Sequence, residues 1–138
     1  RHGATTIWER WDGWTGHGGF QSAAMNSFNH YSLGSVGDWL FGRVAGIDQT
    51  AGSVAYEELL LRPLPGGRLR WARAEQETAR GRVACGWSVT GGRITVDVTI
   101  PPGCTAVLEM PTPDARRVRL ASGRHTITAT LRDPRETP

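Results

Sequence analysis

Two different spacings of apolar residues divide the chain. Between about residues 53 and 131 apolar residues alternate with polar ones, which is the period of a half-buried β-strand. Before residue 48 the regular stretch has a helical period instead and predicts a helix over about 35–46, with Gly46 as its C-terminal stop. The apolar face of this helix comprises Val36, Trp39, Leu40, Val44 and Ile47.

The second part of the chain is predicted to contain seven short strands. They are 54–62, 69–78, 83–89, 94–100, 104–110, 118–120 and 125–131. Gly91-Gly92 predicts a tight hairpin between the third and fourth strands, and Ser122-Gly123 predicts another between the last two. Seven short strands with one apolar face predict an antiparallel β-sandwich, so the chain is expected to be mainly β. The tail over 133–138 is expected to be loose.

The first part of the chain does not carry enough regular structure to form a core alone. One helix with a single apolar face must bury that face against another element. The stretch before it is irregular, rich in aromatic residues and glycine, and of a length typical of functional loops. We therefore expect two domains: 1–50, the end of a larger domain, and 51–138, the sandwich.

Charge and cysteine usage exclude several classes of function. The net charge is +3, but the basic residues are all Arg, are scattered among acidic residues and accompany no nucleic-acid-binding motif. No apolar run is long enough to span a membrane. Cys85 and Cys104 are expected to be buried free thiols rather than metal ligands, and no cofactor or metal is expected. We expect part of a soluble protein, either cytoplasmic or secreted.

The segment Thr5-Thr6-Ile7-Trp8-Glu9-Arg10-Trp11-Asp12 concentrates carboxylates and indoles. Glycoside hydrolysis requires one carboxylate to act on water or carbon and another to protonate the leaving oxygen. Aromatic faces cover the apolar faces of sugar rings. The alternative is that the Trp residues pack a core and that Glu9 pairs with Arg10 or another cation. From the residues alone the two interpretations are balanced.

A second segment, Met25-Asn26-Ser27-Phe28-Asn29-His30-Tyr31, leads into the helix with Gly37-Asp38-Trp39-Leu40. Together with the first segment it resembles the bacterial α-L-rhamnosidases. These are inverting glycosidases that remove terminal rhamnose, and their (α/α)6 catalytic barrel is followed by a C-terminal β-sandwich. The resemblance covers essentially the whole chain and is more specific before about residue 50. It implies that one or two helices and the loop remain from the barrel, whose upstream part would be the missing partner.

The resemblance also implies roles for individual residues. Glu9 matches the family's general base, and His30 matches a histidine that hydrogen-bonds the bound rhamnose. Trp11 and Asp12 are expected to line the pocket or to hold Glu9 in place. The general acid of the family lies upstream of the segments present here, so the isolated chain is expected to be inactive.

Two other functions remain open. One is a non-catalytic β-sandwich that binds carbohydrate or docks a partner; it ranks second because Trp71 and Trp87 are in phase with apolar neighbours and are expected in the core. The other is a six-hairpin glycosidase that acts on a different sugar.

Overall fold

The computed structural model describes residues 3–22, 24 and 26–131, so the predicted loose tail and Met25 lie outside the described residues. The chain forms two compact units, one ending at Trp39 and the other beginning at Leu40. In the described part of the chain, no helix is long and apolar enough to cross a membrane.

The N-terminal unit is mostly loop. A two-stranded hairpin, β1 (Trp14–Thr15) and β2 (Gly19–Phe20), is followed by α1 (Tyr31–Gly34) and α2 (Val36–Trp39). Helical residues continue as η2 (Leu40–Ala45), a π-helical turn that belongs to the second unit. The predicted helix is therefore confirmed, although helical structure begins at Tyr31. It ends at Gly46, whose φ of +87° is a conformation that favours glycine.

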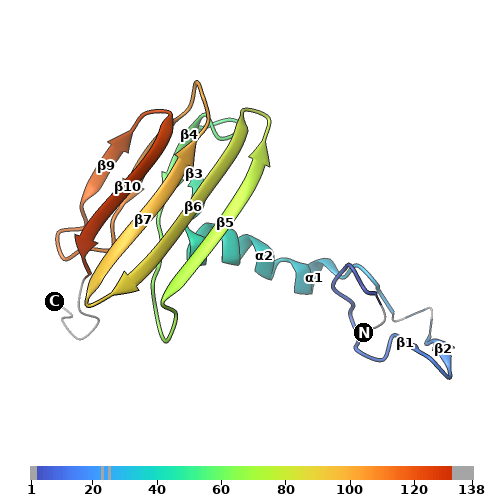
Figure 1. Cartoon of the computed structure of the whole chain (residues 1–138). Coiled ribbons are helices and arrows are strands. Elements are labelled where there is room, and N and C mark those ends of the chain that lie inside the picture. Colours follow the sequence, from blue (N-terminus) through green and yellow to red (C-terminus); the bar gives the residue numbers. More distant parts are fainter. Residues whose placement is uncertain (1–2, 23, 25, 132–138) are drawn as a thin grey trace. The chain divides into compact units, whose positions relative to one another are not determined.

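The second unit is a β-sandwich of two four-stranded sheets (Figure 1). The first sheet has the order β10-β7-β6-β5 and is antiparallel throughout. Its strands are β5 (Trp71–Thr78), β6 (Gly81–Thr90), β7 (Arg93–Ile100) and β10 (Gly123–Thr130). The second sheet has the order β3-β4-β8-β9. Its strands are β3 (Ile47–Gln49), β4 (Glu58–Leu61), β8 (Thr105–Glu109) and β9 (Arg117–Leu120).

The predicted sandwich is thus confirmed, with two differences in topology. β4 and β8 pair in parallel, so the second sheet is mixed. The hairpin predicted at Ser122-Gly123 is wrong, because β9 pairs with β8 in one sheet and β10 pairs with β7 in the other. The chain crosses between the sheets there. The Gly91-Gly92 hairpin is confirmed: Thr90 pairs with Arg93, and both glycines have positive φ, as a two-residue turn requires.

Alternating side chains from both sheets form one core. It includes Leu59 and Leu61 from β4, Leu108 from β8, and the inward residues of β6 and β7. Cys85 and Cys104 are buried and unpaired, as expected. Trp87 is in the core at 3% exposure and donates from Nε1 to the carbonyl oxygen of Val44 at 2.7 Å.

The prediction that Trp71 lies in the core is wrong. Its side chain is 68% exposed on the outer side of the first sheet. Along β5 the inward positions are Ala72 and Ala74, which pack against the core, and the bulky residues therefore point to the opposite face.

Candidate active site

The two N-terminal sequence segments are held together by backbone hydrogen bonds. Glu9 N donates to Ser27 O at 2.8 Å, and His30 N donates to Ile7 O at 2.9 Å. The hydroxyl of Thr6 donates to the carbonyl of Phe28. Residues separated by about twenty positions are therefore neighbours, and the side chains of Glu9 and His30 are brought to the same place.

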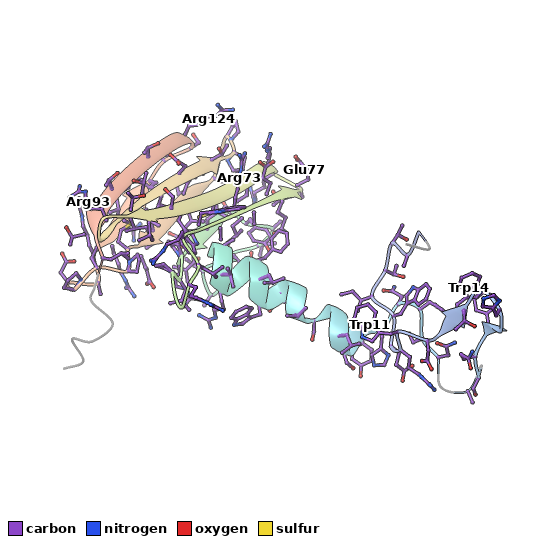
Figure 2. All side chains as sticks on the ribbon, turned by 60° about the horizontal axis from the view of Figure 1, so that its bottom comes forward. Trp11, Trp14, Arg73, Glu77, Arg93 and Arg124 are labelled. Carbon is purple, nitrogen blue, oxygen red and sulfur yellow. The ribbon has the colours of Figure 1, made fainter. Side chains whose placement is uncertain are left out.

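Contacts between aromatic rings also hold the two sequence segments together. The ring of Phe28 meets Trp8 edge to face at 4.8 Å and Phe20 at 5.4 Å between centroids. Such edge-to-face pairs are a preferred arrangement of aromatic rings. In this part of the site the alternative prediction, that Trp residues pack, holds for Trp8. It does not hold for Trp11, which is labelled in Figure 2 and has a relative exposure of 103%.

The carboxylate of Glu9 is anchored through one oxygen. Ser27 N donates to Glu9 Oε2 at 2.9 Å, and the Glu9 side chain is 25% exposed. Among the described residues no hydrogen bond reaches Oε1. Glu9 does not pair with Arg10; Arg10 instead makes two hydrogen bonds to Asp12, at 3.0 and 2.9 Å. Within the described ranges, Oε1 is therefore the oxygen without a hydrogen-bond partner.

His30 lies next to this carboxylate. Its Nδ1 is 3.9 Å from Glu9 Oε2, which is beyond hydrogen-bond distance, and its side chain is 27% exposed. The imidazole is tilted against the ring of Tyr31, with centroids 6.0 Å apart. Among the described residues, no hydrogen bond therefore joins the imidazole to the Glu9 carboxylate.

Trp11 and Asp12 are less closely tied to Glu9. Within the described ranges neither one forms a hydrogen bond or ion pair with it. The hydrogen bond from Arg10 holds the pKa of the Asp12 carboxyl below its usual value. Asp12 is thus an anion that shapes its own loop, and Trp11 presents an uncovered indole.

Sequence reasoning did not identify the partners that position the site. Ser27 acts through its backbone N–H, and Asn26 donates from Nδ2 to Gly13 O at 2.7 Å. Both residues belong to the second sequence segment, Met25 to Tyr31, and membership of that segment is the signal by which they could have been identified. Among the described residues there is no group of three metal-ligating side chains.

Comparisons with known proteins place both parts of the chain in one family. Residues 1–44 match the family model of the bacterial alpha-L-rhamnosidase 6 hairpin glycosidase domain. Residues 46–125 match the model of the bacterial alpha-L-rhamnosidase C-terminal domain.

Individual relatives show the same match. The chain is 40% identical over 121 residues to an alpha-L-rhamnosidase of Streptomyces avermitilis and 36% identical over 118 residues to one of Formosa agariphila. These alignments cover 88% and 86% of the chain but 12% of each relative, so the chain spans about an eighth of their length.

Solved structures are similar over most of the chain. The Streptomyces avermitilis alpha-L-rhamnosidase complexed with L-rhamnose matches with a TM-score of 0.71 at 34% identity, over 92% of this chain and 14% of that one. The native enzyme from Aspergillus terreus matches with a TM-score of 0.73 at 31% identity, over 91% and 14%.

Proposed function

Because this chain belongs to the bacterial α-L-rhamnosidase family, we propose that it supplies the general base of a hydrolase that releases terminal α-L-rhamnose with inversion. Glu9 is the base. Its Oε1 draws a proton from the water that attacks the anomeric carbon, while Oε2 stays bonded to the N–H of Ser27. The hydrogen bond from Ser27 to Glu9 is the observation that carries the proposal, because it orients a carboxylate without neutralising it.

The neighbouring residues bind the sugar. His30 donates to or accepts from a rhamnose hydroxyl beside Glu9, at a ring that is partly exposed. Trp11 places its indole against an apolar face of the substrate, since its side chain is uncovered. Asp12 contributes by holding Arg10 and the loop between Glu9 and Gly13.

The substrate of the whole protein is a rhamnose-containing glycoside or polysaccharide, and its catalysis requires more than these residues. An inverting glycosidase has two carboxyls roughly 6.5–9.5 Å apart, one of them the general acid. We assign that acid to barrel segments outside the 138 residues, and expect the chain alone to be inactive.

Those barrel segments also have a surface to cover. In the N-terminal unit several large hydrophobic residues are about half exposed or more: Phe20, Tyr31, Val36 and Trp39. We propose that helices of the hairpin domain pack against them. The sequence predicts the domain boundary at residue 50. We propose that it lies between Trp39, where the first compact unit ends, and Ile47, where β3 begins.

Replacement of Glu9 by Gln in the full-length parent tests the base assignment. The amide oxygen of Gln accepts from Ser27 N as the carboxylate does, so the fold is preserved, but the amide does not take a proton from water. With an aryl rhamnoside we expect kcat to fall by about 10²–10⁴-fold. Glu57→Gln, a matched change on an exposed side chain of the sandwich, leaves kcat unchanged. A kcat of Glu9→Gln within tenfold of wild type refutes the assignment.

A further inference from the structure

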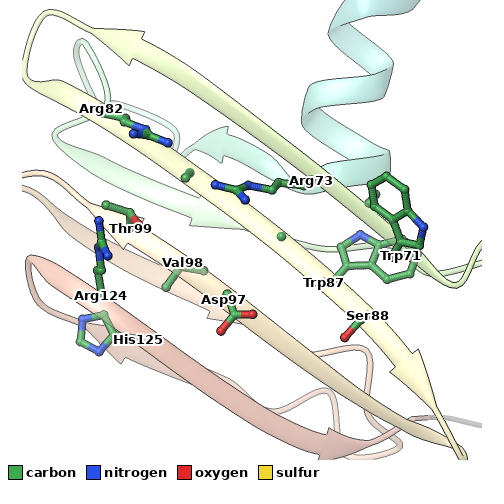
Figure 3. A pocket seen from close by; sticks show the side chains of 13 residues that line it. Trp71, Arg73, Arg82, Trp87, Ser88, Asp97, Val98, Thr99, Arg124 and His125 are labelled. Carbon is green, nitrogen blue, oxygen red and sulfur yellow. The ribbon is translucent and has the colours of Figure 1, made fainter.

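The outer side of the first sheet carries a hollow that the proposed catalysis does not use. Its volume is about 490 Å³, and residues of all four strands, β5, β6, β7 and β10, line it. Figure 3 shows Trp71 at one end, Arg82 and Arg124 with His125 towards the opposite end, and Arg73 between them. We call this the outer-face hollow.

The floor of the outer-face hollow is flat because the outward residues in the middle of β6 are small. They are Ala84, Gly86 and Ser88. A Cβ built on Gly86 would meet Arg73 Cγ and Cβ at 3.5 and 3.6 Å, which are ordinary contacts. Glycine is thus not required there by the backbone. Its effect is to keep the middle of the strand low between taller side chains.

Trp71 forms an apolar wall at one end. Its indole is 68% exposed, although Trp is a residue that proteins usually bury to a large extent. A single exposed indole beside a flat polar floor is the arrangement that contacts the C–H face of a sugar ring.

Arginine dominates the charge of the outer-face hollow. Arg73 and Arg82 both pair with Glu75, and among the described residues neither guanidinium makes a further ion pair. Arg124 makes no ion pair with any described residue. The carboxylate of Asp97 lies opposite and accepts from the hydroxyl of Thr126 at 2.5 Å. Glu75 and Glu77, which faces Arg82 in the register of β5 and β6, balance Arg73 and Arg82, so Arg124 is the cation left for an anionic ligand. Guanidinium groups bind carboxylates through paired hydrogen bonds.

We propose that the outer-face hollow binds an acidic saccharide, one with uronate residues in its chain. The indole of Trp71 packs on one sugar ring, and Arg124 binds the carboxylate of a ring further along. Asp97 accepts from sugar hydroxyls. The site would hold a polymeric substrate by its acidic residues while chemistry occurs elsewhere, but its binding does not depend on the proposed catalysis.

The test measures binding by the 138-residue chain with calorimetry, using a galacturonic acid hexamer as the probe and its methyl ester as the uncharged match. We expect the hexamer to bind at least about tenfold more tightly than the ester at low salt, since the ester lacks the charged partner for Arg124. Trp71→Ala and Arg124→Ala each weaken hexamer binding about tenfold.

Two further variants separate binding from folding. Gly86→Gln raises the floor in a strand whose backbone accepts a side chain, so it blocks the hexamer while the melting temperature stays within a few degrees. Arg119→Ala removes an exposed cation from β9 on the other sheet and leaves binding unchanged. The proposal is overturned if the hexamer does not bind, or if the three hollow variants bind it as wild type does. It is also overturned if a single-stranded DNA 12-mer binds as tightly and independently of Trp71, which would indicate a general polyanion surface.

Discussion

Glu9 and Ser27 bond each other twice: Glu9 N donates to Ser27 O at 2.8 Å, and Ser27 N donates to Glu9 Oε2 at 2.9 Å. The backbone bond sets the distance between the two segments, and the side-chain bond sets the direction of the carboxylate. A carboxylate held in this way has a defined position as well as a defined charge. The length of the side chain at position 9 therefore determines where this carboxylate lies.

Glu9→Asp in the full-length parent keeps the charge and shortens the side chain. The carboxylate then stands about 1 Å or more from its position, and a displacement of that size can cost about 10²-fold in rate. We expect kcat on an aryl rhamnoside to fall by about that factor. Glu57→Asp on the sandwich is the matched control. An aspartate variant as active as wild type would show that position is not what Ser27 provides.

The isolated chain is expected to release no rhamnose. It contains the proposed base, while the proposed general acid lies elsewhere, and loss of one member of a cooperating set removes most of the rate. The measurement is product release from an aryl rhamnoside by the pure chain and by the parent at equal concentration. Steady rhamnose release by the isolated chain, lost in its Glu9→Gln variant, would show that the 138 residues contain a general acid as well as the base.

Gly46 is expected to tolerate no side chain. Its φ is +87°, and a Cβ there would lie 2.3 Å from Pro63 N and 2.5 Å from Arg62 C, both backbone atoms. Gly52 has nearly the same φ, +88°, with nothing within 4 Å. Gly52→Ala should therefore cost about 1 kcal/mol of unfolding free energy, and Gly46→Ala about 3 kcal/mol or more. Urea unfolding measures the loss of unfolding free energy in each variant. Equal losses would show that a side chain at position 46 meets no additional steric clash.

The buried thiol of Cys85 makes stability depend on alkaline pH. Burial, and secondarily the charge of Asp97, raise the pKa of this thiol from 9.0 to about 12. The folded chain keeps the proton where the unfolded chain loses it. Stability is therefore complete below pH 9 and declines as the pH rises towards 12, by about 1.4 kcal/mol per pH unit.

Cys85→Ala isolates this effect from other groups that titrate in the same range. The variant loses a packing contribution that does not depend on pH, so its free energy of unfolding is lower than that of wild type at pH 8. Above pH 9 the difference in unfolding free energy between the two proteins should narrow. Urea unfolding at several pH values between 8 and 11 measures it. Parallel curves for the two proteins would mean that Cys85 does not ionise on unfolding in this range.

The element types of this protein were accessible from local pattern. Alternation in 83–89 and 94–100, with Gly91-Gly92 between them, identifies two strands and their turn, because strand period and turn chemistry are properties of neighbouring residues. The helical spacing before Gly46 is local in the same sense. β3 was missed because three residues are too few to show a period.

Pairing partners and outward faces were not accessible in this way. Val118, Leu120 and Ile127 alternate identically whether their strands form one hairpin or lie in opposite sheets, because alternation reports burial and not the neighbour. The position of Trp71 depended on whether the alanines or the bulky residues of β5 met the core. Space between the sheets decides that, and no local rule contains it.

The sequence by itself determined a sandwich with a helix before it and a carboxylate motif likened to a known family. Local period, turn residues and specific short motifs suffice for those. Only the tertiary structure decided that Ser27 holds Glu9, that β9 and β10 belong to different sheets, and that Trp71 lies on an outer face and not in the core. Each of these is a contact between distant or alternative partners, and the free energy that selects it comes from packing of the whole unit.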